Sequence, residues 1–330
     1  MKIGVVGVGA LGFHHARILR ELPGVEFVGF FESRAERATA VAAELGVRAH
    51  ESVESLIDAA EALTIVVPTP AHYAVAKAAV SRGKHVLIEK PITTTLAEAD
   101  DLIATAQASG AIIQTGHVER FNRAIRAALP VIDTPRFIES DRLAPFNVRG
   151  SDVAVVLDLM IHDIDLIRTL VGGHITELSA VGVPVLTPTA DIANARIAFD
   201  TGAVANITAS RVSRERMRKL RIFQRSGYLS LDLAAGTGDY FRMRSDVNPA
   251  ALMAAGPVQL ESFVEHIALD APAGEPLKLE FESFVAALQG AQPVAVTGED
   301  GREALAVALR IMQEIERSLP SLAGAGQARA

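Results

Sequence analysis

Residues 2–12 read KIGVVGVGALG, and this stretch decides the fold class. Residues 2–8 are apolar and β-branched, and the run is short enough to predict a buried strand. A helical pattern follows over about residues 10–21. Three glycines in the order Gly-x-Gly-x-x-Gly occupy the turn between the two, and this context is typical of a dinucleotide-binding site.

Each glycine of this turn has its own physical reason. Gly7 permits the tight turn, Gly9 lets the backbone approach a pyrophosphate, and Gly12 allows the helix to pack closely on the strand. The N-terminus of the helix would then face the phosphates. The predicted cofactor site includes the other residues of the turn as well, namely Val8, Ala10 and Leu11.

Glu32 ends a second predicted strand, residues 25–32, and follows Gly12 by about 20 residues, as a ribose-binding acid does. Its carboxylate would accept hydrogen bonds from the adenosine ribose and would repel a 2′-phosphate, so NAD is favoured over NADP. Ser33 and Arg34 come next. Arg34 could pair with such a phosphate or stack on adenine, or it could be a solvated residue at a helix start.

Strands and helices alternate through the first part of the chain, which predicts an α/β fold with a doubly wound parallel sheet. The expected strands cover 47–52, 62–68, 84–91 and 111–117, and the expected helices cover 33–46, 53–59, 71–83 and 95–110.

The second part differs. A helical segment around 120–129, a strand at 136–143 and a long apolar helix at 153–172 precede a series of five strand-like segments between 175 and 235. Two helices, 277–290 and 301–319, follow. We expect a dinucleotide-binding domain over 1–118 and an α+β domain with a large, mostly antiparallel sheet over 119–330, with the last helix able to pack back on the first domain.

Composition excludes several classes of protein. The chain of 330 residues carries a net charge of −7 and no cysteine, which argues against a nucleic-acid binder and rules out disulfides, thiolate metal sites and a cysteine nucleophile. No apolar run reaches the roughly 18 residues of a membrane span, and the glycine-rich N-terminus makes a poor signal peptide. We therefore expect a cytoplasmic protein without metal.

Polar clusters follow two of the predicted strands, at the edge where doubly wound sheets bind ligands. Pro68, Thr69 and His72 come after the strand 62–68 and form either a rigid turn or a wall of the cofactor site. Glu89 and Lys90 end the strand 84–91. Lys90 is either a surface lysine or a group whose pKa a cleft lowers into the range of a general base.

The order of these motifs resembles the glucose–fructose oxidoreductase / inositol dehydrogenase / rhizopine-catabolism family. The glycine turn continues into His15, and Glu89-Lys90-Pro91 and Asp158-x-x-x-His162 follow in family order, over essentially the whole chain. The resemblance implies oxidation of a sugar or polyol hydroxyl to a ketone. It also implies that Lys90 contacts substrate and nicotinamide, with a Lys90–Pro91 bond that is often cis.

Asp158 and His162 match the acid/base pair of that family. Four residues apart, they share one helix face, which also carries Asp165. A buried core histidine is the common alternative, but burying two carboxylates and a histidine for packing alone would be costly. Lys90, Asp158 and His162 are the predicted catalytic residues, and either Lys90 or His162 takes the hydroxyl proton.

Within the family, the chain looks closest to a subgroup that oxidises the 3-hydroxyl of UDP-N-acetylglucosamine ahead of transamination in lipid A synthesis. The segments that carry this likeness are 116–122, 136–143 and 149–152. The alternatives are an inositol-like polyol dehydrogenase and a non-catalytic dinucleotide-binding regulator. The predicted cofactor contacts at this edge are Glu89, Lys90 and His117. The predicted substrate contacts are Lys90, Arg120, Asn122, Arg149 and His162, with Arg142 as a further candidate.

Residues 211–221, RVSRERMRKLR, form a local basic stretch in an acidic chain. Arginines there could pair with a nucleotide diphosphate, or they could be an exposed charged hairpin or sheet edge. An apolar face on the second sheet would favour self-association, and the family resemblance points to a homodimer or homotetramer.

Overall fold

The computed structural model describes residues 1–147, 153–244 and 263–318. Two compact units divide the chain: the first contains residues 1–121 and 274–306, and the second contains the described residues between 122 and 273 and from 307 onward. Within the described residues, no helix is long and apolar enough to cross a membrane.

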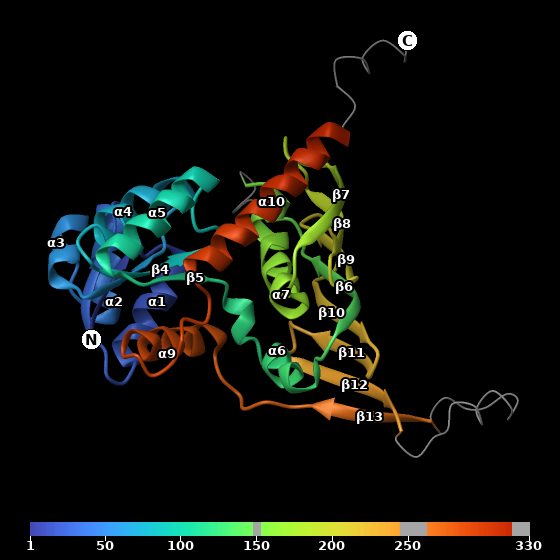
Figure 1. Cartoon of the computed structure of the whole chain (residues 1–330). Coiled ribbons are helices and arrows are strands. Elements are labelled where there is room, and N and C mark those ends of the chain that lie inside the picture. The colour runs from blue at the N-terminus through green and yellow to red at the C-terminus, as the bar shows by residue number, and fades with distance from the viewer. Residues whose placement is uncertain (148–152, 245–262, 319–330) are drawn as a thin grey trace, which may run out of the picture. The chain divides into compact units, whose positions relative to one another are not determined.

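The first unit is built on a parallel sheet of five strands in the order β2-β1-β3-β4-β5, with helices packed against it (Figure 1). Its strand order reverses between β1 and β3, and such a switch point is where open α/β sheets bind ligands. The strands are β1 Lys2–Val6, β2 Glu26–Phe31, β3 Ala62–Ile65, β4 His85–Glu89 and β5 Ile113–Gly116. The helices between them are α1 Ala10–Glu21, α2 Ala35–Leu45, α3 Val53–Ala59, α4 His72–Val80 and α5 Leu96–Ser109.

One predicted strand of this unit is wrong. Residues 47–52 form no strand and contribute only an isolated bridge between Ala49 and Phe30. The segment lies parallel to β2 only at this bridge, where the Phe30 N–H donates to the Arg48 carbonyl at 3.0 Å and the His50 N–H donates to the Phe30 carbonyl at 2.7 Å.

Helix α9, Pro276–Leu288, belongs to the first unit, although the expected boundary at 118 assigned it to the second domain. Its buried face carries Phe281 and Phe284, which join the same apolar cluster as Ile3 and Leu19. The sequence shows that this helix has an apolar face but not which sheet that face covers. Helix α10, Gly298–Ser318, contributes to both units.

The second unit contains an eight-stranded sheet in the order β13-β12-β11-β10-β6-β9-β8-β7. All neighbours are antiparallel except β6 and β9, so the expected mostly antiparallel sheet is confirmed. Its strands are β6 Pro135–Leu143, β7 Ile175–Val183, β8 Ile192–Phe199, β9 Val204–Ser210, β10 Met217–Gln224, β11 Gly227–Asp232, β12 Thr237–Met243 and β13 Val264–Leu269. No expected strand corresponds to β12 or β13.

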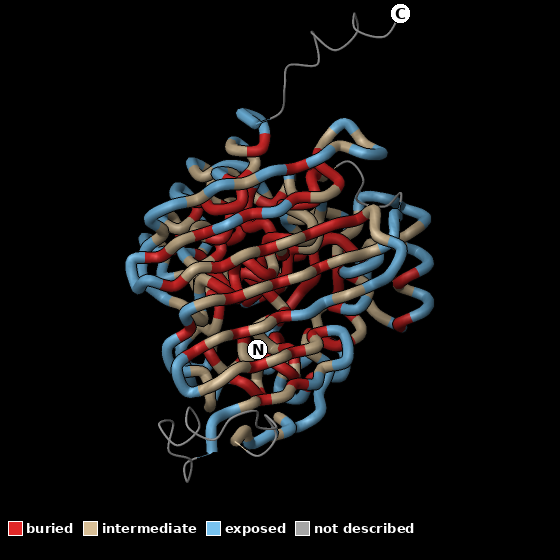
Figure 2. Tube along the Cα trace, turned by 90° about the vertical axis from the view of Figure 1, so that its right-hand side faces the viewer, coloured by how far each residue is buried: buried red, intermediate tan, exposed pale blue. Residues whose placement is uncertain are grey.

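The two faces of this sheet differ. Helices α6, Arg123–Ala128, and α7, Ile161–Val171, pack on one face, where alternate residues such as Ile138 and Ser140 are buried. The intervening residues point to the other face and are mostly half-buried, which gives the alternation of red and tan along the strands in Figure 2. The expected helix 153–172 begins with a π-helical turn, Val156–Met160, before α7.

Candidate functional site

The glycine-rich turn has the shape of a phosphate cradle. Gly7 has φ of 88°, and a Cβ there would lie 2.6 Å from the Val66 carbonyl oxygen. A Cβ on Gly12 would lie 1.9 Å from the Gly7 carbonyl oxygen. Gly9 is different, because the nearest atom to its Cβ position is an Arg34 side-chain nitrogen at 3.8 Å. Gly7 and Gly12 therefore serve the fold, while Gly9 leaves space for a ligand.

Helix α1 presents its N-terminus at this turn. Gly9 is its N-cap and supplies no side-chain hydrogen bond, and its first turn contains no acidic residue. Ala10 and Leu11, the first two residues of the helix, are exposed. Such a helix end fits a phosphate group.

Glu32 follows β2, and its carboxylate contacts the backbone of the glycine-rich turn. Its Oε2 accepts a hydrogen bond from the Val8 N–H at 3.1 Å, and its Oε1 accepts from Arg34 Nε at 2.9 Å. Burial alone would raise the pKa of Glu32, but these hydrogen bonds outweigh burial and hold the pKa below its ordinary value. Arg34 is largely exposed, and so is Ser33.

Arg37 is a residue of this turn that sequence reasoning missed. Its Nε donates to the Val8 carbonyl at 2.8 Å, and its guanidinium lies 5.6 Å from the centre of the Phe13 ring. It lies one helical turn after Arg34, on the start of α2 that faces the glycines. The three-residue spacing from Arg34 is the only sequence feature that points to Arg37, and many helices without a ligand site have such a spacing.

The three predicted residues of the proline loop after β3 differ in how far they are buried. Pro68 is exposed and Thr69 half-buried, whereas His72 is buried and braces two backbone segments. Its Nδ1 lies 2.8 Å from the Pro91 carbonyl and its Nε2 lies 2.9 Å from the Val67 carbonyl. Burial lowers the pKa of His72, although both carbonyls oppose this shift.

Glu89 and Lys90 lie at the carboxyl end of β4, next to Gly116 at the end of β5. Glu89 is 8% exposed and its Oε2 accepts the Lys90 N–H at 3.2 Å. Burial would raise the pKa of Glu89, but contacts with His15 and Lys90 hold it below its ordinary value. The Lys90–Pro91 peptide bond is cis.

The residues that follow β5 have structural partners within their own units. Arg120 of the first unit donates to the Ala295 carbonyl at 3.0 Å. Asn122 of the second unit caps α6 through the Ala124 N–H and donates to the Leu233 carbonyl at 2.8 Å. Each side chain therefore joins distant parts of the chain within its own unit, and the contact of both with substrate stays a prediction. His117 is buried directly after β5.

Asp158 lies in the π-helical turn and His162 in the first turn of α7, and both are half-buried. A π-turn at this place is an irregularity often found at functional sites. Asp165 of the same helix is fully buried.

Arg142 forms a buried ion pair within the second unit. It is 3% exposed and forms a two-pronged ion pair with Asp163 of α7, with distances of 2.7 and 3.1 Å. Arg149 lies outside the described residues.

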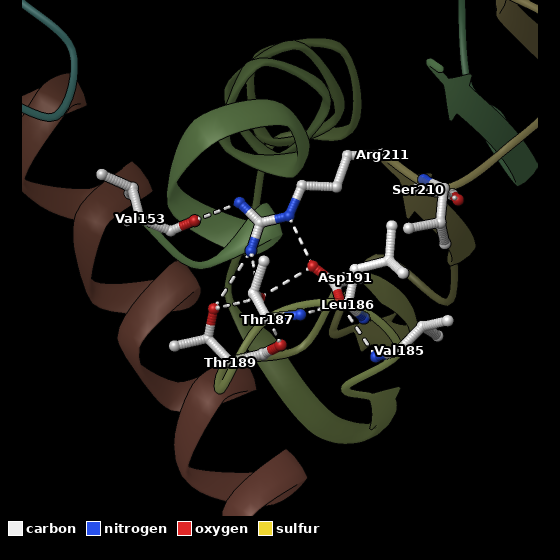
Figure 3. Close-up of polar contacts among 9 residues, drawn as sticks. Val153, Val185, Leu186, Thr187, Thr189, Asp191, Ser210 and Arg211 are labelled. Carbon is white, nitrogen blue, oxygen red and sulfur yellow. Dashed lines mark hydrogen bonds and ion pairs between the residues drawn. The ribbon is translucent and has the colours of Figure 1, made fainter. Parts of the chain in front are cut away.

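The basic stretch 211–221 splits into buried and exposed members. Arg211 is 4% exposed and pairs with the fully buried Asp191 at 2.8 Å (Figure 3). It also donates to the carbonyl of Val153 at 2.5 Å, three residues before the π-helical turn begins at Val156. Arg221 pairs with Glu139 at 3.2 Å. Of the stretch, Arg214, Arg216, Arg218 and Lys219 are exposed.

Asp191 fixes a loop as well as Arg211. Its Oδ2 accepts the N–H groups of Val185, Leu186 and Thr187 at 2.6–2.9 Å, and its Oδ1 accepts the Thr187 hydroxyl (Figure 3). Burial would raise the pKa of Asp191, but the backbone N–H groups and Arg211 hold it far below its ordinary value. No motif or spacing in the sequence indicates this pairing.

A parallel sheet with this turn, this acidic residue and this helix end defines a dinucleotide-binding protein. Among the described residues, no group of three or more histidine, aspartate and glutamate side chains could hold a metal ion. Residues 1–117 match the model of an oxidoreductase family with an NAD-binding Rossmann fold, and residues 139–230 match the GFO/IDH/MocA C-terminal domain. The chain belongs to the Gfo/Idh/MocA family of oxidoreductases.

One relative named for its activity covers nearly the whole chain, and a second covers 64% of it. It is 39% identical to a UDP-N-acetylglucosamine 3-dehydrogenase of Acidithiobacillus ferrooxidans over 97% of this chain and 98% of that protein. The solved structure of that enzyme covers 96% of this chain and 98% of its own, with a TM-score of 0.87. A scyllo-inositol 2-dehydrogenase (NAD(+)) of Bacillus subtilis is 31% identical over 64% of this chain and 68% of its own length.

Proposed function

We propose that this oxidoreductase converts the 3-hydroxyl of UDP-N-acetylglucosamine to a ketone. The observation that carries the proposal is the 39% identity with the 3-dehydrogenase over nearly the full length of both chains. The resulting ketone is a substrate for transamination, so an aminotransferase would consume it in lipid A synthesis. A cytoplasmic location suits a nucleotide-sugar substrate.

NAD is the cofactor that the first unit fits best. The open space at Gly9 and the exposed start of α1 suit its pyrophosphate, and Glu32 suits its ribose hydroxyls. Because the pKa of Glu32 is held low, the carboxylate is ionised at neutral pH and repels a 2′-phosphate. Bound NAD supplies the hydride acceptor of the reaction.

The chain's own residues then handle the proton of the substrate hydroxyl. Lys90 and His162 are the two candidates to take it, and Asp158 would orient or charge-stabilise its neighbour. Lys90 stands at the end of β4, held by Glu89 through its backbone N–H. Arg120, Asn122 and Arg149 are proposed substrate contacts.

The test is the formation of NADH with a panel of substrates. We expect turnover with UDP-N-acetylglucosamine and little or none with free glucose. The inositol-like alternative has support from the 31% identity with the scyllo-inositol enzyme, so scyllo-inositol and myo-inositol belong in the panel. Turnover with an inositol and none with the nucleotide sugar would refute the proposed substrate and support the alternative.

We further propose that the chain forms a homodimer or homotetramer through the open face of the second sheet. A row of rings crosses five strands there, from Phe137 through Phe223, Tyr228 and Phe241 to His266, with neighbouring centroids 4.7–5.8 Å apart. These rings are only partly covered within one chain. Phe223→Asp should lower the mass measured by analytical ultracentrifugation, and an unchanged mass would exclude this face.

A further inference from the structure

His15 lies buried beneath the proposed catalytic turn and has no part in the mechanism above. It is 0% exposed on α1. Its Nδ1 lies 2.8 Å from Thr64 Oγ1 on β3, and its Nε2 lies 3.2 Å from Glu89 Oε1 at the end of β4. Phe281 of α9 packs edge-on against the ring, with centroids 5.1 Å apart.

The two ring nitrogens make different kinds of contact. Nδ1 shares a hydrogen bond of 2.8 Å with the Thr64 hydroxyl. Nε2 lies 3.2 Å from Glu89 Oε1 in an ion-pair contact whose geometry is not that of a hydrogen bond. The hydrogen bond with Thr64 therefore fixes the ring in an orientation that places Nε2 against one oxygen of the carboxylate.

The second oxygen of Glu89 contacts the next residue of the turn. Oε2 accepts the Lys90 N–H at 3.2 Å, and the carboxyl group lies against Gly116, where an added Cβ would be 3.0 Å from it. Glu89 is therefore held on three sides, by His15, the Lys90 backbone and β5. An aliphatic residue would fill the space of His15 without the cost of burying polar groups, so packing alone does not explain this arrangement.

We propose that His15 is a positioning residue, which fixes the carboxylate of Glu89 and thereby the turn that presents Lys90. The inference rests on the proposed role of Lys90. The charged and titratable groups that act on Glu89 are His15 from α1, His72 from α4 and Lys90 beside it. Of these, His15 places a ring nitrogen 3.2 Å from Oε1.

The first test compares two replacements of one side chain. His15→Leu removes both polar contacts, whereas His15→Gln keeps an amide N–H that can reach Glu89. We expect His15→Leu to lower kcat about 10- to 100-fold, because small displacements of reacting groups have effects of this size. His15→Gln should recover most of the loss, and NADH affinity should change much less than kcat. His14→Gln, at the exposed neighbouring position, should match the wild type.

The second test needs no substrate. The carboxyl carbon of Glu89 can be followed by NMR in protein labelled with 13C-glutamate, with Glu89→Gln identifying the signal. Because contact with His15 helps to lower the pKa of Glu89, His15→Leu should raise its titration midpoint. Equal activity in His15→Leu and the wild type, or an unmoved titration, would overturn the proposal. A raised midpoint in a chain that oxidises no sugar would refute the proposed function and leave the positioning of Glu89 intact.

Discussion

The turn around Lys90 and the helix that carries Asp158 and His162 are positioned in different ways. Lys90 follows directly from a strand end, with Glu89 and Gly116 in register on neighbouring strands. Asp158 and His162 depend on partners far away in the sequence. Arg142 on β6 holds Asp163, and Arg211 after β9 holds the Val153 carbonyl. The first position thus follows from strand register, with His15 beside Glu89, and the second from an ion pair and a hydrogen bond that arginines of the second unit make.

The largest expected effect is on catalysis, and it tests whether both positions contribute. Lys90→Ala and His162→Ala should each lower kcat/KM by about 10³- to 10⁴-fold, the upper range for removal of an acid/base group. Lys278→Ala, at an exposed position on α9, is the matched control. Steady-state kinetics check this result. If both variants keep full activity, the catalytic assignment is wrong.

The second effect concerns stability and compares a buried with an exposed ion pair of the same basic stretch. Arg211→Ala leaves Asp191 buried without its cation and should lower the free energy of unfolding by about 3–5 kcal/mol. Arg221→Ala breaks the more exposed pair with Glu139 and should cost at most about 1 kcal/mol. Urea unfolding measures both. Equal losses would mean that Arg211 does not anchor the second unit.

The same pair predicts a dependence on pH. The pKa of Asp191 is lowered in the folded state, so its stabilisation is present above its unfolded pKa of about 4 and is lost as the pH falls through the folded pKa. As the pH falls below about 4, the free energy of unfolding of the wild type should therefore decrease more than that of Asp191→Asn. Parallel acid-unfolding curves for the two proteins would contradict this prediction.

The third effect separates two glycines of one turn. Gly12→Ala places a Cβ 1.9 Å from a backbone oxygen and should lower stability by about 1–3 kcal/mol. Gly9→Ala meets only the end of Arg34 at 3.8 Å and should fold normally, yet bind NADH about tenfold more weakly. Thermal unfolding and a fluorescence titration with NADH distinguish the two. A loss of stability in Gly9→Ala would mean that the space beside it serves the fold.

The same contrast explains what could be predicted from the sequence. The parallel sheet, the glycine turn, Glu32 and Glu89-Lys90 follow from local patterns, and the structure contains them. The π-turn at Asp158, the pairs Arg142–Asp163 and Arg211–Asp191 and the strands β12 and β13 depend on distant neighbours. A basic stretch looks uniform in sequence, although Arg211 is buried and Arg214 is exposed, because only the fold decides which arginine meets a carboxylate.

The smallest expected effect is that of Arg34→Ala, and its comparison with Glu32→Gln concerns the choice of cofactor. Glu32→Gln removes the negative charge that accepts the Val8 N–H and repels a 2′-phosphate. The variant should therefore bind NAD about tenfold more weakly, and its preference for NAD over NADP should be smaller than that of the wild type. Arg34→Ala removes an exposed partner of Glu32 and should change NAD affinity by less than about fivefold. Values of kcat/KM for both cofactors check this. If Arg34→Ala instead abolishes activity with NADP while NAD activity persists, Arg34 pairs with the phosphate, and Glu32 alone does not set the choice.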